Sequence, residues 1–552
     1  MVKRDMARLL EEAVRDAQRR GLIPLVALPD VLLERPQNPE HGDHASSLPL
    51  KLARAARMNP MAIAQAITSC IQLPPQVQKV TTAPPGFINF ALHPAWLARQ
   101  VDTILELGEG YGNLDLGGRK PIQVEFVSVN PTGPLHVGHG RGAILGSTLA
   151  RVLAAAGYSV ATEYYINDAG NQMNAFYRSL FARYQQALGL EAELPPDGYQ
   201  GDYVIDMARE IVAREGDRFL NMPPPEAVEA IGKIGVKKVL ESIAQDLARL
   251  GVTFDVWFSE QSLYREGQYQ RAMAILRDKG YIEEREGAVW FVSTALGEDK
   301  DNVLVRGDGS PTYFASDVAY HYNKFQERGF QQVINIWGAD HQGHVSRMKA
   351  VVGALGFDPD RLRIIITQMV TLKRGEALLR ASKRSGDIVT LRELVDEVGA
   401  DACRFVFLSR SADSQMEFDL ELAKLQAPEN PVYYVQYAHA RIASILHLAQ
   451  ERGIDYSSGD VALLTHPAEQ ALLRKMIQLE ELVETVALSL EPHYLPHYSQ
   501  DLATAFHSFY KQCRVVSKNE KLTHARLKLV AAAQITLART LHLMGMTAPE
   551  RM

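Results

Sequence analysis

Between Gln123 and Ile166 the pattern of apolar and polar residues changes period twice. Residues 124–129 are mostly apolar and β-branched, a pattern typical of a buried strand. Residues 130–134 (Asn-Pro-Thr-Gly-Pro) interrupt it, because proline and glycine break regular structure. From Leu135 apolar residues recur at helical spacing up to Gly157, a residue that favours a helix end, and Val160–Ile166 is apolar again. Strand, helix and strand predict a βαβ unit, hence a parallel sheet whose ligand crevice lies at the carboxyl ends of its strands.

Other short apolar runs predict further strands at residues 87–92, 288–292 and 333–337, and one more from Ile364. Residues 1–112 form a first predicted domain, which a glycine-rich boundary closes. The parallel sheet is expected within residues 113–400, with a helical insertion at about 176–296. Residues 401–425 form a connector, and residues 426–552 are helical. The expected fold class is α/β and multidomain: a Rossmann-type parallel sheet with a helical insertion, a small α+β N-terminal domain and an all-α C-terminal bundle.

Composition narrows the class of protein. A length of 552 residues suffices for about three to four domains, and 46% hydrophobic with 22% charged residues is typical of a soluble globular protein. No run approaches the roughly 18 apolar residues of a membrane span, so no membrane partner is expected. Cys70, Cys403 and Cys513 are too scattered for a disulfide framework or a zinc motif, which favours the cytoplasm. The net charge of −6 gives no support for nucleic-acid binding, which would need local basic patches.

Two histidines stand where the predicted loop becomes the helix. His136 and His139 are three residues apart, so both rings face one side of the first helical turn. The N–H groups and the positive dipole end at that place favour a phosphate anion. Gly138 leaves room for a flat base to approach the backbone. An ordinary helix start with two solvated histidines explains these four residues about equally well, whereas a metal site lacks acidic or cysteine partners at ligand spacing.

Polar residues also follow the later predicted strands, where ligand-contacting loops of parallel sheets lie. The strand at 333–337 is followed by Gly338, Asp340 and His341. The loop after the last strand carries three cations, Arg380, Lys383 and Arg384, around the small residues Ser382, Ser385 and Gly386. Such a loop can wrap a polyphosphate, although a solvated charged turn is the more frequent explanation.

The C-terminal region is locally basic. Cations and aromatic residues gather in one stretch: Phe509, Tyr510, Lys511, Arg514, Lys518, Lys521, Arg526 and Lys528. From the charges alone, the better explanation is the solvated face of a helix bundle. The alternative is an RNA surface, on which cations contact phosphates and aromatic rings stack on unpaired bases.

Together, the HVGH of the βαβ unit and the SKRSG after the last strand resemble the paired signatures of class I aminoacyl-tRNA synthetases. The segments EFVSVNPTGPLHVGH, YFASD and WGADHQGHV, and the tail from AHARI to LHLMGMTAPERM, resemble arginyl-tRNA synthetases over nearly the whole chain. GDHA (Gly42–Ala45) and GFINF resemble the N-terminal domain of that family. One departure is Ala381, which stands where the family's KMSKR signature has methionine, while Lys383 is retained.

The resemblance implies an arginine–tRNA ligase that uses ATP, with Mg²⁺, to form arginyl-adenylate and then charges the 3′ adenosine of tRNA(Arg), releasing AMP and diphosphate. It also implies a cytoplasmic monomer without zinc, whose residues 1–112 contact tRNA and whose residues 426–552 bind the anticodon. The implied catalytic residues are His136, His139 and Lys383. The implied ATP-binding residues are Pro131, Gly133, His136, Gly138, His139, Gly338, Asp340, Ser382, Lys383 and Arg384.

The arginine-binding residues implied by the resemblance are Glu125, Asn130, His139, Tyr313, Asp317 and His341. A guanidinium is planar and permanently charged, so its site needs carboxylates that accept paired hydrogen bonds. Glu125 lies among apolar residues and needs a cation, either the substrate or an internal salt bridge. Tyr313 and Asp317 fall one helical turn apart. Two rivals are a cysteinyl-type synthetase, for whose zinc ligands the three cysteines lie too far apart, and a tRNA-binding paralogue without activity.

Overall fold

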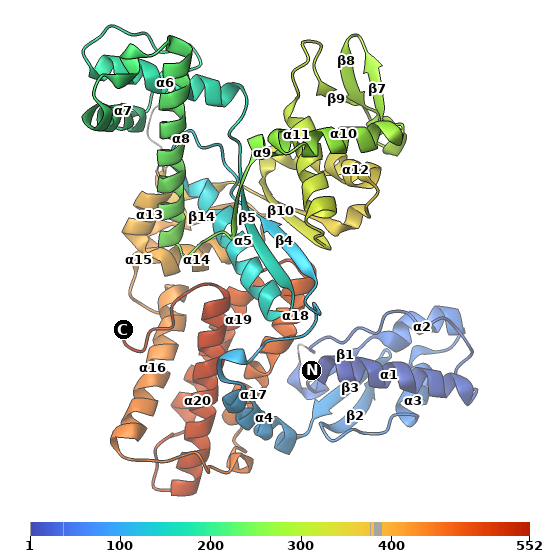
Figure 1. Ribbon diagram of the computed structural model, residues 1–552. Helices are drawn as coiled ribbons and strands as arrows, with labels where there is room; N and C mark the ends of the chain where they lie inside the picture. Colours follow the sequence, from blue (N-terminus) through green and yellow to red (C-terminus); the bar gives the residue numbers. More distant parts are fainter. Residues whose placement is uncertain (1, 37, 376, 380–388) are drawn as a thin grey trace.

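The computed structural model describes residues 2–36, 38–375, 377–379 and 389–552 (Figure 1). The N-terminal domain has an antiparallel sheet in the order β1-β3-β2, with α2 and α3 packed on it and α1 packed on α3. Its elements are α1 (Val2–Arg19), β1 (His44–Ser46), α2 (Leu48–Ala56), α3 (Pro60–Ser69), β2 (Val77–Ala83) and β3 (Phe87–Leu92). The small α+β N-terminal domain expected from the sequence is therefore confirmed.

A parallel sheet lies at the centre of the molecule, in the order β11-β10-β4-β5-β6. Its strands are β4 (Pro121–Glu125), β5 (Ser159–Ile166), β6 (Val256–Ser259), β10 (Gln332–Gly338) and β11 (Leu362–Thr367). α5 (Val137–Ala155) connects β4 to β5 and packs so closely that a Cβ on Gly146 would lie 2.1 Å from the Phe126 ring. The predicted βαβ unit and parallel sheet are confirmed, and the central position of β4 puts its carboxyl end between two neighbouring strands.

β4 is shorter than the apolar pattern predicted. It ends at Glu125, and the chain then turns through Val127 and Ser128, whose φ angles are 69° and 43°. The prediction of one strand over residues 124–129 was therefore wrong. A β-branched residue at positive φ is strained, and such strain is typical of functional sites. The turn brings the Ser128 hydroxyl back to the Glu125 carboxylate.

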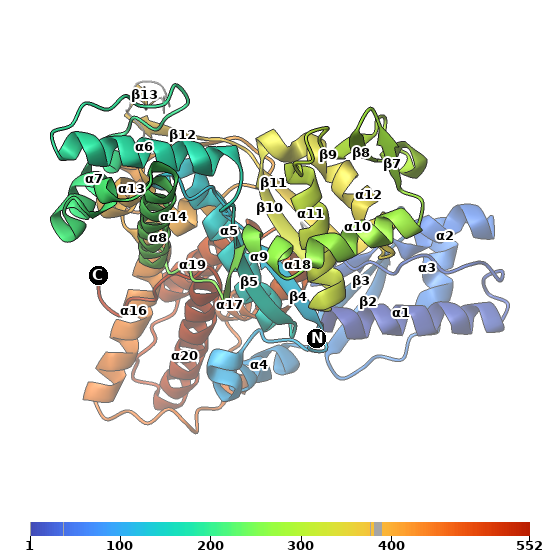
Figure 2. The same cartoon turned by 45° about the horizontal axis from the view of Figure 1, so that its top comes forward.

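The chain between β5 and β10 contributes helices, a strand and a second sheet. α6 (Asn171–Ala187), α7 (Asp202–Glu215) and α8 (Pro224–Arg249) form a helical unit beside the sheet (Figures 1 and 2). β6 then pairs in parallel with β5, so residues 176–296 are not purely an insertion but also supply an edge strand. Beyond it lie α9 (Glu260–Arg265), α10 (Gln268–Asp278) and the antiparallel strands β7 (Ile282–Arg285), β8 (Ala288–Phe291) and β9 (Asn302–Val305). α11 (Tyr313–Tyr322) and α12 (Val345–Leu355) flank β10 in the sequence.

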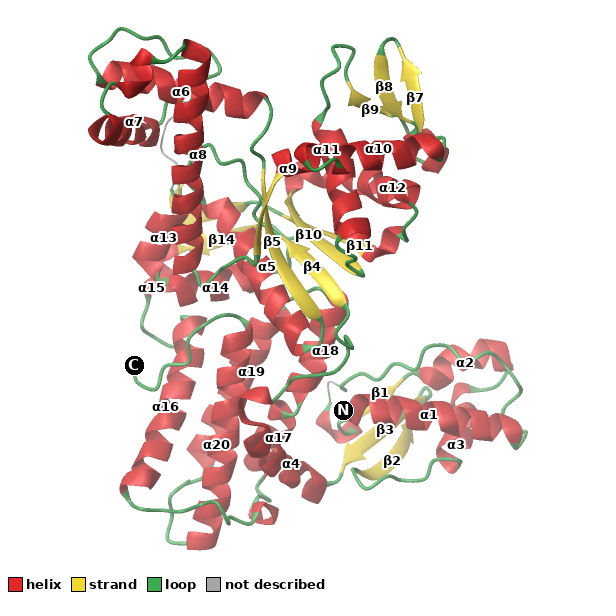
Figure 3. Ribbon diagram, viewed as in Figure 1, coloured by secondary structure: helices red, strands yellow, loops and turns green. Residues whose placement is uncertain are grey.

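A small sheet, β13-β12-β14, follows the central one. It consists of β12 (Val370–Arg374), β13 (Ala377–Leu379) and β14 (Met416–Asp419), with α13 (Leu391–Val398), α14 (Ala400–Leu408) and α15 (Leu420–Lys424) beside it. The rest of the chain is helical, as Figure 3 shows: α16 (Pro431–Glu451), α17 (Pro467–Met476), α18 (Gln478–Ser489), α19 (Tyr494–Gln512) and α20 (Glu520–Leu543). α4 (Pro94–Leu107) packs against α17 and α20, so it belongs spatially to this bundle. Within the described part of the chain, no helix combines the length and apolar character of a membrane span.

Candidate active site

The two signature histidines cap the first turn of α5. Nδ1 of His136, the N-cap residue, accepts a hydrogen bond from the Gly138 N–H (3.1 Å), and Nδ1 of His139 accepts one from the His136 N–H (3.2 Å). The two rings stack with their centroids 3.5 Å apart. A neutral imidazole that accepts at Nδ1 carries its proton on Nε2. This local geometry therefore fixes both rings as hydrogen-bond donors through Nε2, at the positive end of a helix.

Aromatic hydroxyls from two other elements hold the loop that precedes α5. Tyr164 of β5 donates to the carbonyl of Val129 (2.8 Å). Tyr203 of α7 donates to the carbonyl of Thr132 (2.6 Å). The helical unit α6–α8 thus contacts the backbone of the strained loop that leads into the histidines.

Three carboxylates lie close together at the carboxyl ends of β4 and β6 and in the first turns of α11. Glu125 ends β4, Glu260 follows β6 directly, and Asp317 lies one turn into α11. Burial, together with the negative charges of Glu125 and Glu260, raises the pKa of Asp317 to about 7. Burial also raises the pKa of Glu260, whose Oε2 has no hydrogen-bond partner among the described residues. The three side chains therefore place more negative charge here than their protein neighbours satisfy.

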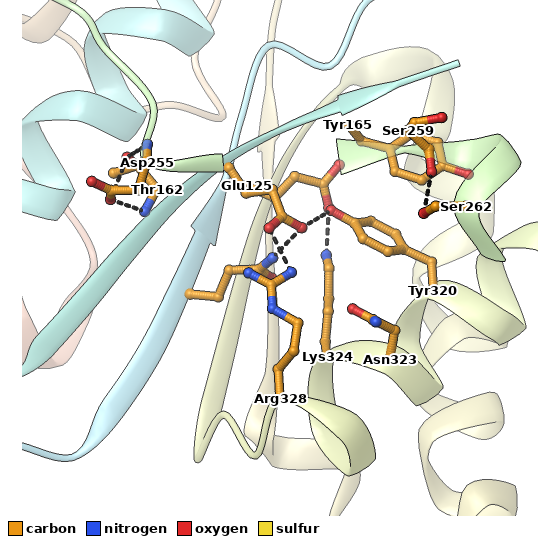
Figure 4. A network of polar contacts seen from close by, with 12 residues as sticks. Glu125, Thr162, Tyr165, Asp255, Ser259, Ser262, Tyr320, Asn323, Lys324 and Arg328 are labelled. Carbon is orange, nitrogen blue, oxygen red and sulfur yellow. Dashed lines mark hydrogen bonds and ion pairs between the residues drawn. The ribbon is translucent and has the colours of Figure 1, made fainter. Parts of the chain in front are cut away.

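Glu125 does have an internal cation. Figure 4 shows Lys324 extending from the π-helical turn Asn323–Glu327 to the Glu125 carboxylate, with which it forms an ion pair. Lys324 is fully buried and also donates to Asn335 Oδ1 (3.0 Å). Ser128 donates to the other oxygen of Glu125 (3.0 Å). The internal salt bridge that the sequence left open is present, and these contacts fix the orientation of the carboxylate.

A fourth buried carboxylate, Glu163 of β5, has its charge neutralised by a protein cation. Gln123 and Tyr320 both donate to its Oε1, and Arg328 forms an ion pair with its Oε2. Figure 4 shows Tyr320 and Arg328 beside Lys324, on the same side of the sheet. Because Glu163 is neutralised internally, it differs from Glu260 and Asp317, which retain unsatisfied capacity for a cation.

Three family profiles match the sequence in order along the chain. They are described as "Arginyl tRNA synthetase N terminal domain" (residues 4–92), "tRNA synthetases class I (R), catalytic domain" (100–417) and "DALR anticodon binding domain" (435–552). An arginine–tRNA ligase of Dehalococcoides mccartyi is 59% identical over 551 residues, covering 100% of this chain and 99% of that protein. This chain belongs to the arginyl-tRNA synthetase family.

A second relative supports the assignment to this family, and a solved structure supports the fold. An arginine–tRNA ligase of Heliobacterium modesticaldum is 48% identical over 558 residues, covering 100% of this chain and 99% of that protein. The structure of Thermus thermophilus arginyl-tRNA synthetase matches with a TM-score of 0.79 and covers 100% of both chains. At 24% identity this second match supports the fold alone. The chain is therefore a class I synthetase with the fold expected from its sequence.

Several residues expected in the synthetase's substrate sites lie around the same sheet edge. Tyr313 is 51% exposed at the start of α11. Asn130 hydrogen-bonds to Gln172 at the start of α6. His341, after β10, is exposed, and its Nε2 lies 3.4 Å from Asp340 Oδ2. Of the other expected ATP-site residues, Pro131 and Gly133 lie in the loop before α5, and Gly138 in its first turn, where an added Cβ would lie 3.0 Å from the His136 ring.

Three expected ATP-site residues, Ser382, Lys383 and Arg384, lie outside the described residues. The described chain that follows these residues begins beside the histidines. β13 stops at Leu379, while the backbone of Thr390 forms a bridge with His136. The Leu391 N–H also donates to the Leu135 carbonyl (2.9 Å). The chain thus returns directly to the first turn of α5 after this segment.

Glu260 was missed by the sequence interpretation. It follows β6, a strand of only four residues whose side chains are all partly exposed, so no alternation marks it as part of a sheet. The usable signal was a carboxylate between Ser259 and Gln261 after the apolar pair Trp257 and Phe258. That pattern is too short to separate a strand end from an ordinary turn.

The basic C-terminal stretch is only partly available to an external partner. Arg526 forms an ion pair with the buried Glu469, and Lys528 forms one with Asp102 of α4. The other four cations are exposed: Lys511, Arg514, Lys518 and Lys521. Nearby, the Arg441 guanidinium lies between the rings of Tyr437 and Tyr510, at 5.1 and 5.0 Å. The bundle therefore exposes a smaller basic face than the sequence suggested.

Proposed function

We propose that this synthetase binds L-arginine among Glu125, Glu260 and Asp317, at the carboxyl edge of the central sheet, and activates it with ATP. The observation that supports this best is the excess of carboxylates, since Lys324 is paired with Glu125 while one oxygen of Glu260 has no hydrogen-bond partner among the described residues. A guanidinium can donate paired hydrogen bonds to two carboxylates and stays charged at any physiological pH. Arginine therefore supplies the cation that this site lacks.

Each side chain has a distinct place in the proposed arginine site. Glu260 and Asp317 receive the guanidinium, because neither forms an ion pair among the described residues, and the pKa of Asp317 stays raised to about 7 although the charges of Arg347 and Lys324 oppose the rise. Glu125, held by Lys324 and Ser128, presents a fixed charge to the remainder of the substrate. The outer contacts are proposed to come from Asn130, His139, Tyr313 and His341.

Activation joins an arginine carboxylate oxygen to the α-phosphorus of ATP and breaks the bond from that phosphorus to the leaving diphosphate. No protein nucleophile is required, so positioning and charge stabilisation provide the rate acceleration. His136 and His139 donate Nε2–H groups to phosphate oxygens, and the α5 dipole reinforces them. Lys383, with Ser382 and Arg384, contributes to phosphate binding. Mg²⁺ arrives with ATP and shares the phosphate charge.

The second step transfers the arginyl group to the 3′ adenosine of tRNA(Arg), with release of AMP. The N-terminal domain and the C-terminal bundle are proposed to contact the same tRNA, the bundle through its exposed cations and aromatic side chains. The enzyme is proposed to act as a cytoplasmic monomer.

ATP–diphosphate exchange with each amino acid, with and without tRNA(Arg), tests the proposal. Of the amino acids tested, only arginine should support exchange. A protein that gives no exchange with any amino acid would be a tRNA-binding paralogue without activity. Glu260→Gln should raise KM for arginine by about 30-fold or more, because a charged hydrogen-bond acceptor is lost, and leave KM for ATP unchanged. Glu163→Gln is the matched control, since Arg328 already neutralises that buried glutamate. If the two variants have the same KM for arginine, the assignment of Glu260 fails.

A further inference from the structure

The N-terminal domain (residues 2–92) joins the helical bundle without a linker. β3 ends at Leu92, His93 caps α4, and α4 packs against α17 and α20 of the bundle. Figures 1 and 3 show the N-terminal sheet projecting sideways from this junction. A change of backbone angles near His93 would therefore swing the whole domain, unless side chains fix its orientation.

Among the described residues, four pairs of ionisable side chains cross this junction to α17 and α18. Arg35 donates two hydrogen bonds to Glu481 (2.9 and 3.2 Å), and His44 Nε2 lies 3.0 Å from Glu481 Oε1. Arg474 Nε donates to Asp43 Oδ1 (2.7 Å). Arg4 forms an ion pair with Glu484 near the outer edge. Asp43 and His44 are the central residues of the GDHA motif, which is not part of the candidate active site.

The motif is built into the domain and is not a surface tail. Gly42 has φ 89°, and a Cβ there would lie 2.5 Å from the carbonyl oxygen of Phe90 in β3. Asp43 is 8% exposed and uses its second oxygen to accept from the Leu92 N–H (2.7 Å), at the junction itself. His44 is fully buried. Although burial raises the pKa of Glu481, hydrogen bonds from His44 and the charge of Arg35 hold it below its usual value.

The packing of the domain against the bundle is interrupted by a cleft. A cavity of about 250 Å³ lies in the same junction, lined by residues of both parts that include Gln76, Trp96 and Glu480. At this cleft the two parts are not held together by the close packing of a protein interior. The directional contacts of Asp43, His44 and Arg35 are therefore the groups that define the angle between the two parts.

We propose that Asp43, His44 and Arg35 form an interdomain latch on Arg474 and Glu481, which fixes the separation between the two tRNA-contacting surfaces of the enzyme. This proposal rests on the proposed function, since it requires both surfaces to bind one tRNA. When two surfaces are held at the correct separation, the second contact is intramolecular and little freedom remains to be lost on binding. The latch residues are positioning residues, so they govern tRNA affinity and leave the chemistry unchanged.

Glu481→Gln gives the sharpest test, because the loss of the latch and the loss of a negative charge predict opposite changes in the affinity for tRNA. Removing a negative charge from a protein that binds a polyanion should by itself tighten binding. Loss of the latch should instead raise KM for tRNA by about tenfold, a part of the 10²–10⁴ gain available from fixed geometry. At saturating tRNA, kcat should stay within about twofold of wild type, because the active site is untouched. Glu481→Asp, which keeps the charge, should restore part of the affinity.

A matched pair of variants on α17 controls for charge. Arg474→Gln removes a cation whose partner lies across the junction, and Lys475→Gln removes the neighbouring cation, whose partner Asp501 lies within the bundle. Both variants change the net charge equally, so non-specific attraction to tRNA changes equally. Arg474→Gln should raise KM for tRNA about tenfold relative to Lys475→Gln. Small-angle scattering should show a larger radius of gyration only for the latch variants.

Equal KM values for Arg474→Gln and Lys475→Gln, or tighter tRNA binding by Glu481→Gln, would overturn the latch. If the melting curve shows that Glu481→Gln does not fold, the comparison of Arg474→Gln with Lys475→Gln decides. Arg474→Gln is expected to fold, because Asp43 still accepts its hydrogen bond from the Leu92 N–H in that variant. Failure of the proposed function has a different signature. In that case wild-type enzyme does not bind tRNA or gives no arginine-dependent exchange, whatever the latch variants do.

Discussion

Arginine binding should be coupled to the loss of a proton from Asp317. Burial and the charges of Glu125 and Glu260 raise the pKa of Asp317 to about 7 in the unliganded enzyme. A guanidinium placed against this carboxylate favours its charged form, so the complex keeps Asp317 ionised at lower pH. The perturbation is a change of pH from 6 to 8, applied to wild-type enzyme and to Asp317→Asn.

The size of the effect follows from that pKa. Between pH 6 and pH 8 the protonated fraction of Asp317 falls from about ten elevenths to about one eleventh. If the complex stays ionised throughout, affinity is reduced by the factor 1 + 10^(7−pH), about 11 at pH 6 and about 1.1 at pH 8. Arginine should therefore bind about tenfold more tightly at pH 8, a difference of about 1.4 kcal/mol. The pH dependence of folding stability is opposite to that of arginine binding. The unliganded fold holds the Asp317 proton more tightly than the unfolded chain does, so the free energy of unfolding falls as the pH rises from about 4 to about 7.

Calorimetric titration with L-arginine alone, in two buffers of different ionisation enthalpy, measures both affinity and proton release. About 0.9 protons should leave at pH 6 and about 0.1 at pH 8. Asp317→Asn has no proton to release at this position. Its affinity for arginine should be weaker and should not change with pH, after correction for the titration of the substrate's own amino group. A wild-type affinity that changes less than about twofold over this range, with no proton release, would refute the reasoning.

Three further predictions concern catalysis, tRNA binding and specificity. Replacing His136 or His139 by alanine should lower kcat for exchange by about 10²–10³-fold, through loss of a transition-state hydrogen bond, and unchanged turnover in both variants would remove them from the site. Affinity for tRNA should fall steeply with salt, and Lys511→Gln should reduce the slope of log K against log salt by about 0.7–0.9, whereas Lys528→Gln should not, because Lys528 is paired with Asp102. Citrulline, which has nearly the shape of arginine but no charge, should be rejected by about 10⁴-fold in the exchange assay; activation within about tenfold of arginine would contradict the carboxylate site.

The features that the sequence predicted correctly are those with a local signal. α5 has helical periodicity, a capping residue and a terminating Gly157, and the strands at 87–92 and 333–337 have continuous apolar runs. The turn at Val127 was not predictable, because it is the surrounding fold that holds valine at positive φ. The sheet's edge strand β6 was also missed, since four partly exposed residues gain their stability from pairing with β5 and not from their own pattern.

The residues of the candidate site also divide into those with a local sequence signal and those that depend on the surrounding fold. The sequence singles out His136 with His139, and Asp317 with Tyr313, because each pair falls within one turn of its own helix and the family resemblance implies a role for all four residues. Glu260 and Lys324 were not found, because their importance depends on which element packs opposite them. Lys324 lies in a polar stretch, NKFQER, that resembles any solvated helix end, yet the fold buries it completely against Glu125. Tertiary structure determines whether a charged side chain is buried, so no local sequence pattern predicts it.

The carboxylates of the site relieve their mutual repulsion in different ways. Glu125 has an internal ammonium, that of Lys324. Asp317 holds a proton over part of the physiological pH range, and one oxygen of Glu260 accepts no hydrogen bond from the part of the chain that the structure describes. A guanidinium displaces the proton and satisfies the oxygen at once, whereas a neutral isostere leaves the negative charges unbalanced and an ammonium lacks the fork geometry to reach both. In the proposed site, selectivity for arginine therefore depends on the carboxylate charge that the unliganded protein does not compensate, and the ion pair with Lys324 leaves Glu260 and Asp317 as the residues that carry it.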